Sequence, residues 1–199
     1  MRPIKDQEVE LDLIKYLRFN DERIYMFYLM LRYTAFRASD ILPLKVGDIQ
    51  GDYIVIKEKK TEKRVNKEAR KVLIHEDLKE ELKEYIKGKH SWEVLFPSHK
   101  GTNKSLSYTQ AYRILKEASK VIGIDDFGTH SGRKTCAYYI YKESGDLNEV
   151  KTFLMHEDNR DTIRYVGIEQ EVRDNSIKKI NSPLAIMKKQ IKSGSEKGM

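Results

Sequence analysis

Between residues 129 and 168, two histidines, an arginine and a tyrosine have the side chains needed to hold and attack a phosphate group. His130 and Arg133 are three residues apart at the expected start of a helix, so both lie on one face of it. Amides at a helix N-terminus attract anions, and an arginine fork can bond two oxygens of one phosphate. Tyr165 is a candidate nucleophile, although a phenol with an ordinary pKa of about 10 needs a base or cationic neighbours. His156 and the His-x-x-Arg pair are neighbours of that kind.

Each of these residues also has an ordinary structural interpretation. The pair His130 and Arg133 fits a solvated basic helix end, and His156 fits a histidine that offsets a helix dipole. A single tyrosine such as Tyr165 is more often a core residue than a nucleophile. The remainder of the chain must therefore decide between the two interpretations.

The N-terminal half contributes two further candidates, an arginine and a lysine. Arg37 lies in a tight segment that follows a strongly apolar stretch, where it would supply the second half of a two-arginine clamp. A salt bridge to Asp40 or Asp48 is the alternative. Lys60, at the tip of a charged hairpin, would reach into a DNA groove or donate a proton, whereas a solvated loop is the usual role of a lysine-rich turn.

Apolar periodicity places these candidates on a mainly helical scaffold. Helices are expected over about 8–20, 21–33, 76–86, 107–121, 129–143 and 146–154, with a short one before Pro43, another around Tyr165, and one or two over 169–192. The β-rich runs 53–57 and 71–75 flank a charged segment and predict a hairpin or small antiparallel sheet. The predicted fold class is mixed α+β, mainly α-helical, with a small antiparallel β-sheet near residues 53–75.

Local signals predict the ends and faces of several of these helices. In the first helix, the apolar positions Leu11, Ile14 and Leu17 fall at helical spacing, and Asn20-Asp21 is expected to end that helix and cap the next. Ser39 or Asp40 is expected to cap the short helix before Pro43. Ser107-x-x-Gln110 is a capping-box pattern, and Gly145 is expected to end the helix that begins near residue 129.

Composition limits the partners and the compartment. The net charge of +7 favours a polyanion, with nucleic acid as the first candidate and an anionic membrane surface as the second. Because Cys136 is the single cysteine, an internal disulfide is excluded. Its sequence neighbours predict that Cys136 is a small core residue. No apolar run approaches the roughly 18 residues that a membrane span needs. A cytoplasmic protein is expected.

Taken together, the candidates resemble the catalytic domain of the tyrosine recombinases, the lambda-integrase type of phage and transposon integrases. Residues 34–42 resemble the TGxRxSE(I/L) box of that family, residues 130–134 its HxLRHT box, and residues 154–168 its LGHxxxxxTxxYxxI box. The resemblance covers roughly residues 5–175. Ala35 stands at a usual glycine, Asp40 at a frequent glutamate, Gly132 at a usual apolar residue, and Met155 at a common glycine.

The resemblance implies site-specific DNA recombination or integration, by cleavage and rejoining through a covalent 3′-phosphotyrosyl link. No cofactor and no metal are implied. The implied catalytic residues are Arg37, Lys60, His130, Arg133, His156 and Tyr165, with Tyr165 as the nucleophile, and the implied DNA-contacting residues are Lys59, Lys63, Arg64 and Lys134. The lysine assignment is open among Lys57, Lys59, Lys60 and Lys63, and Lys60-Thr61 fits best.

The resemblance also implies partners and domain organisation. Double-stranded DNA is the expected partner, bound by a homotetramer that is a monomer when free, with accessory DNA-bending factors and no membrane. A catalytic domain is expected over 1–180 and a C-terminal helix with a flexible tail over 181–199, without the family's N-terminal core-binding domain. The resemblance also implies that the protein is encoded by a prokaryote, a phage or a mobile element. The alternatives are a non-catalytic DNA-binding relative or regulator, and a metal-dependent nuclease with clustered carboxylates such as Asp125-Asp126.

Overall fold

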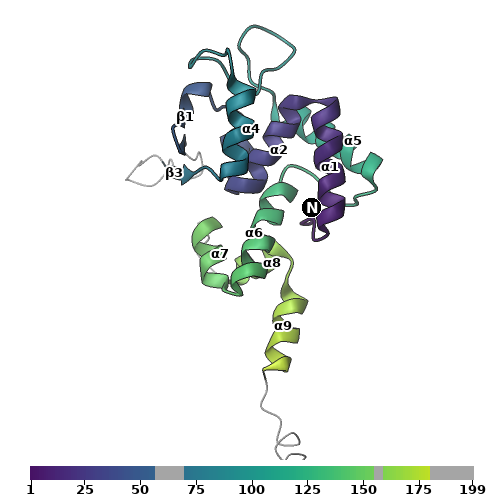
Figure 1. Ribbon diagram of the computed structural model, residues 1–199. Coiled ribbons are helices and arrows are strands. Elements are labelled where there is room, and N and C mark those ends of the chain that lie inside the picture. Colours follow the sequence, from purple (N-terminus) through teal and green to yellow (C-terminus); the bar gives the residue numbers. More distant parts are fainter. Residues whose placement is uncertain (57–69, 155–158, 180–199) are drawn as a thin grey trace, which may run out of the picture. The chain divides into compact units, whose positions relative to one another are not determined.

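The computed structural model describes residues 1–56, 70–154 and 159–179 (Figure 1). Contacts divide the chain into two compact units, Met1–Gly167 and Ile168–Met199. The predicted fold class, mainly helical with a small antiparallel sheet, is confirmed. The first unit contains, in chain order, α1 (Gln7–Asn20), α2 (Glu22–Thr34), α3 (Ala38–Ile41), the 3-10 helix η1 (Val46–Asp48), β1 (Ile49–Gln50), β2 (Tyr53–Ile56), β3 (Arg70–Leu73), α4 (Glu76–Ile86), α5 (Tyr108–Ile122), α6 (Ser131–Ser144), α7 (Leu147–Leu154) and α8 (Asn159–Val166), and the second contains α9 (Glu169–Lys178).

Helix α2 is the centre of the first unit. Every residue from Ile24 to Leu31 is buried, and the helix contacts α1, α3, α4, α5 and α6. The predicted cap is confirmed, because the Asp21 carboxylate accepts hydrogen bonds from the amides of Arg23 and Ile24. A helix that is apolar around its whole circumference must be covered on all sides, which explains this central position.

The buried face of α1 does not include every apolar position of its helical pattern. Leu13 and Leu17 are buried together with Glu10, whereas Leu11 is 41% exposed. The face is set by packing against α2 and α5, and it includes a carboxylate because Tyr28 of α2 donates a hydrogen bond to Glu10. The periodic pattern alone did not show that an acidic residue would take a core position.

The sheet has the order β1-β2-β3, with both pairs antiparallel. The predicted hairpin strands are confirmed as β2 and β3, where Ile54 pairs with Val72, and the two-residue β1 adds an edge that the sequence did not indicate. Ile54 and Ile56 are buried while Tyr53 is 45% exposed, the alternation expected of a half-buried strand.

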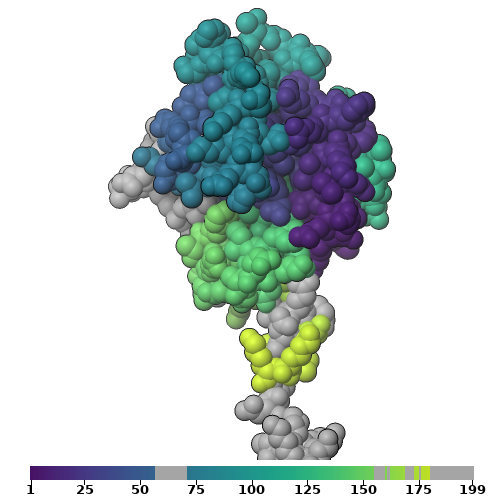
Figure 2. All heavy atoms as spheres, in the orientation of Figure 1, coloured from purple at the N-terminus to yellow at the C-terminus, as the bar shows by residue number. Residues whose placement is uncertain are grey.

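Helices α6, α7 and α8 contact one another beneath the layer that contains α1, α2 and α4 (Figure 1). Figure 2 shows α6 and α7 in green packed directly against the purple and teal residues of that layer. Two predicted boundaries are confirmed, since Ser107 and Gln110 form a capping box on α5 and Gly145 ends α6 in the left-handed conformation. No described helix is long and apolar enough to cross a membrane.

Candidate active site

Among the predicted site residues that the structure describes, Arg133 is the most deeply buried cation. It lies in the first turn of α6 and is 2% exposed, which makes it one of the largest fully buried side chains. Its Nη1 donates to the carbonyl of Ala35 and its Nη2 donates to the carbonyl of Leu154 at 2.9 Å. One guanidinium therefore joins the turn after α2 to the end of α7, and both bonds fix its plane.

The turn between α2 and α3 positions Arg37. Ala35 adopts a left-handed conformation with φ of 49°, and the Thr34 hydroxyl donates to Met30 and accepts from the amide of Phe36. Phe36 is fully buried and anchors the turn. The prediction that Ser39 or Asp40 caps α3 is wrong. Arg37 itself, with an extended backbone, is the N-cap residue and forms no side-chain cap bond; because α3 begins at Ala38, Ser39 and Asp40 lie inside the helix.

Tyr165 of α8 lies against the cations of α6. The Nζ of Lys134 is 4.9 Å from the centroid of its ring, and the guanidinium carbon of Arg133 is 5.8 Å from it. Burial raises the pKa of the phenol. The charge of Arg133, a hydrogen bond from Arg133 and the charge of Arg37 lower that pKa. The phenol is therefore protonated in this arrangement and surrounded by positive charge.

His130 is the N-cap residue of α6 and is half-buried. Burial lowers the pKa of its imidazole, and the charges of Arg133, Lys134 and Arg37 lower it further. A histidine with a lowered pKa is neutral at pH 7, so it can accept a proton. The structure thus brings Arg37, His130, Arg133, Lys134 and Tyr165 into one cluster.

The remaining predicted residues lie outside the described ranges. Lys60, its competitors Lys57, Lys59 and Lys63, and Arg64 fall in residues 57–69, and His156 falls in residues 155–158. Their predicted roles stay predictions.

Positioning groups appear that sequence reasoning did not identify. The carbonyls of Ala35 and Leu154 hold Arg133, and Lys5 donates from Nζ to the carbonyl of Gly167 at 3.2 Å, just after α8. The amide of Ile4 also donates to the Thr135 hydroxyl of α6 at 2.8 Å. Main-chain acceptors leave no signal in a sequence, and nothing in the pattern around Lys5 indicates its partner.

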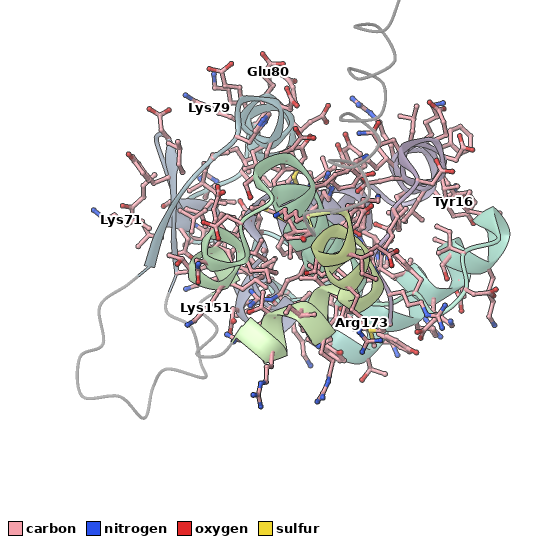
Figure 3. All side chains as sticks on the ribbon, turned by 90° about the horizontal axis from the view of Figure 1, so that it is seen from below. Tyr16, Lys71, Lys79, Glu80, Lys151 and Arg173 are labelled. Atoms are coloured by element: carbon pink, nitrogen blue, oxygen red, sulfur yellow. The ribbon has the colours of Figure 1, made fainter. Side chains whose placement is uncertain are left out.

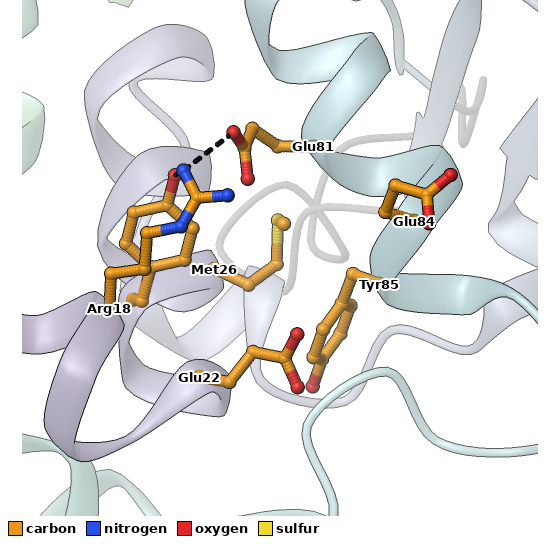
Figure 4. Close-up of a pocket in the computed structure, with 7 residues that line it drawn as sticks. Arg18, Glu22, Met26, Glu81, Glu84 and Tyr85 are labelled. Carbon is orange, nitrogen blue, oxygen red and sulfur yellow. Dashed lines mark hydrogen bonds and ion pairs between the residues drawn. The ribbon is translucent and has the colours of Figure 1, made fainter.

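Two other features lie apart from this cluster. In the part of the chain that is described, no three His, Cys, Asp or Glu residues gather as a metal site, and Asp126 instead pairs with the Met1 ammonium at 2.8 Å. A pocket of about 210 Å³ lies between α1, α2 and α4, where Arg18 and Glu81 form an ion pair at 3.0 Å (Figure 4). None of the predicted site residues lines this pocket.

Comparison with known proteins identifies the family of this arrangement. The model of the phage integrase family matches residues 5–171. The chain belongs to the phage integrase family. This integrase-family chain is similar to the probable integrase/recombinase YoeC of Bacillus subtilis (strain 168), with 39% identity over 172 residues that cover 86% of this chain and 92% of YoeC. Family membership assigns the chain to the recombinases that act in site-specific DNA recombination.

Other relatives of the integrase-family chain are longer. Tyrosine recombinase XerA of Saccharolobus solfataricus is 30% identical over 150 residues, which cover 75% of this chain and 47% of XerA. The chain therefore spans about half the length of that relative. The crystal structure of XerA recombinase superposes with a TM-score of 0.70 at 19% identity, covering 92% of this chain and 67% of that one. The structure of a lambda integrase dimer bound to a COC′ core site superposes with a TM-score of 0.64 at 18% identity, covering 83% of this chain and 47% of that one. These similarities establish the shared fold.

Proposed function

We propose that this protein cleaves and rejoins DNA strands through Tyr165, by way of a covalent 3′-phosphotyrosyl intermediate. The observation that supports this most directly is the position of the Tyr165 ring against Lys134 and Arg133, with the charge of Arg37 also acting on the phenol. In the proposed step the phenolic oxygen bonds to phosphorus and the 5′-oxygen leaves as a hydroxyl. A second 5′-hydroxyl then reverses the step, so the phosphodiester energy is kept and no nucleotide is consumed.

Arg37 and Arg133 would neutralise the charge that gathers on the non-bridging oxygens. Positive groups that are already in place stabilise such a transition state without reorganising during the reaction. Arg133 is suited to this role because two main-chain carbonyls hold its guanidinium in position. The charge comes from side chains, so we expect the reaction to proceed in EDTA.

His130 would act as general base toward the phenol and as general acid in the reverse step. Its lowered pKa leaves it neutral at pH 7, the form that can take the phenolic proton. By the family resemblance, Lys60 would protonate the leaving 5′-oxygen and His156 would hydrogen-bond the phosphate. Lys59, Lys63, Arg64 and Lys134 would contact the DNA backbone, with binding that weakens steeply with salt.

The proposed partner is double-stranded DNA that carries a recombination site. A lambda integrase tetramer has been crystallised on a Holliday junction, and by analogy this protein would be a monomer when free and a homotetramer on DNA, with accessory DNA-bending factors. We propose residues 1–180 as the catalytic domain; the C-terminal helix and tail predicted over residues 181–199 lie outside the described residues.

A covalent-trapping assay on a nicked duplex that carries the recombination site tests the proposal. We expect the wild-type protein to form a protein–DNA adduct in EDTA and Tyr165→Phe to form none. Tyr112→Phe, which removes the hydroxyl of a half-buried tyrosine on α5, is the matched control and should form the adduct. An adduct with Tyr165→Phe would reject this nucleophile. DNA binding without any wild-type adduct would instead support the non-catalytic DNA-binding relative.

A further inference from the structure

Lys134 has a position that a lysine serving only as a DNA-backbone contact does not need. It is half-buried in the first turn of α6, and its ammonium lies nearer the Tyr165 ring, at 4.9 Å, than the guanidinium carbon of Arg133 does, at 5.8 Å. A cation within about 6 Å of an aromatic centroid is attracted to the ring. The contact therefore links α6 to the α8 side chain that is proposed to react.

We propose that Lys134 is a positioning residue for the nucleophile, whose ammonium holds the Tyr165 ring against α6 and stabilises the phenolate as it forms. This inference rests on the proposed function of Tyr165. It gives Lys134 a role in the chemical step that is distinct from neutralising the DNA backbone.

The charges around the phenol explain why a second α6 cation matters. From the described residues, Arg133 and Lys134 face it on α6 and Arg37 faces it ahead of α3, with the Cys136 thiol as a titratable neighbour. The guanidinium of Arg133 donates to two carbonyls, which hold it in place. Lysine has a compact charge on a flexible stem, so Lys134 can move with the phenol as it approaches the phosphorus.

Lys134 also acts on the other partner in the proton transfer. Its charge is among those that lower the pKa of His130, which keeps the imidazole neutral. Near the phenol, whose pKa burial raises, the Lys134 ammonium lies 4.9 Å from the ring centroid, where a positive charge favours the ionised form. One ammonium therefore favours both the neutral base and the ionised nucleophile.

The test compares Lys134→Met, Lys134→Arg and a matched control, Lys142→Met. Lys142 lies on the same helix, and its Nζ is 5.6 Å from the ring of Tyr139, a tyrosine outside the cluster. For each protein, the Tyr165 titration is followed by NMR of ¹³Cζ-labelled tyrosine, with Tyr165→Phe to assign the signal. Single-turnover adduct formation on the nicked recombination-site duplex is measured against pH at saturating protein, and duplex affinity is measured against salt.

We expect Lys134→Met to slow adduct formation by about tenfold and to shift the Tyr165 titration and the rise of the pH–rate profile to higher pH. Lys134→Arg should restore most of the rate of adduct formation. Lys142→Met should change neither the rate of adduct formation nor the Tyr165 titration. The contrary result is that Lys134→Met weakens duplex binding and lowers the slope of log affinity against log salt by about one, while the pH–rate profile stays where it is. That result would show that Lys134 contacts only the DNA backbone, and the inference fails. If the wild-type protein forms no adduct, the proposed function fails instead, and the role of Lys134 fails with it.

Discussion

A β carbon on Gly132 would lie 2.9 Å from the β carbon of Leu31 and 3.3 Å from Cε2 of Tyr28. Helices α6 and α2 therefore approach each other at a point where residue 132 can have no side chain. The recombinase box has an apolar residue at this position, and the contact with α2 explains why such a residue would not fit here. The close approach sets the position of Arg133, the next residue of α6.

Gly132→Ala should destabilise the protein by about 1–3 kcal/mol, because the added methyl group overpacks the helix contact. At an exposed helical position the same substitution would stabilise by up to about 1 kcal/mol, so the sign of the change is diagnostic. Urea unfolding at equilibrium measures the change. A midpoint equal to or above that of the wild type would contradict the close contact.

Ala35→Gly should stabilise the protein by about 0.5–1 kcal/mol, since Ala35 has a φ of 49° that costs an L-residue energy and a glycine little. Ala38→Gly is the matched control, because Ala38 is also buried but lies in α3, where glycine should cost about 1 kcal/mol. Thermal unfolding of the two variants should give shifts of opposite sign. Two shifts of the same sign would argue against strain at residue 35.

Arg133→Lys should lower both stability and activity, because one ammonium cannot reach the carbonyls of Ala35 and Leu154 together. A buried carbonyl left without a donor costs about 1–3 kcal/mol. The rate of adduct formation should fall by about 100-fold or more, the usual effect of losing a charge-stabilising donor. Arg113→Lys on α5, which changes an exposed arginine, should behave like the wild type in both assays. A fully stable Arg133→Lys variant would show that the two carbonyl bonds contribute little.

Glu10→Ala should cost about 3 kcal/mol, because it leaves the buried Tyr28 hydroxyl and the half-buried Arg32 guanidinium of α2 without this acceptor. Glu10 is 6% exposed, accepts from the Tyr28 hydroxyl at 2.8 Å, and pairs with Arg32 at 2.8 Å. Asp12→Ala, which breaks an exposed pair on the same helix, should cost less than about 1 kcal/mol. Urea unfolding of both variants provides the comparison, and equal losses would contradict a special role of Glu10.

Alkaline pH should remove a contribution that Cys136 makes to stability. Burial raises the pKa of its thiol from an ordinary 9.0 to about 11. The folded state therefore holds the thiol proton more tightly, so the contribution is complete below pH 9 and is lost as the pH rises toward 11. This pKa shift corresponds to about 2–3 kcal/mol of unfolding free energy. The difference in unfolding free energy between the wild type and Cys136→Ala should be constant below pH 9 and shrink by that amount above it. A constant difference throughout would contradict the shift.

Much of the fold could be predicted because its signals are local. The caps at Asp21 and Ser107, the stop at Gly145 and the strands around Ile54 depend on residues only a few positions apart. The exposed side of α1 and the cap of α3 could not be predicted, because each depends on a partner elsewhere in the chain. Leu11 is exposed since α2 and α5 cover the adjacent face, and α3 begins after a turn that is fixed by contacts of its own.

The sequence by itself determined which side chains are available to the site, their order, and the family that their spacing resembles. Only the tertiary structure decided how they meet. Arg133 reaches a carbonyl 98 residues before it and another 21 residues after it, and the cations of α6 meet the ring of Tyr165 from a different helix. The physical reason is that main-chain acceptors and ring faces have no residue-specific code. Their positions follow from how closely α6 packs on α2, which the missing side chain of Gly132 permits.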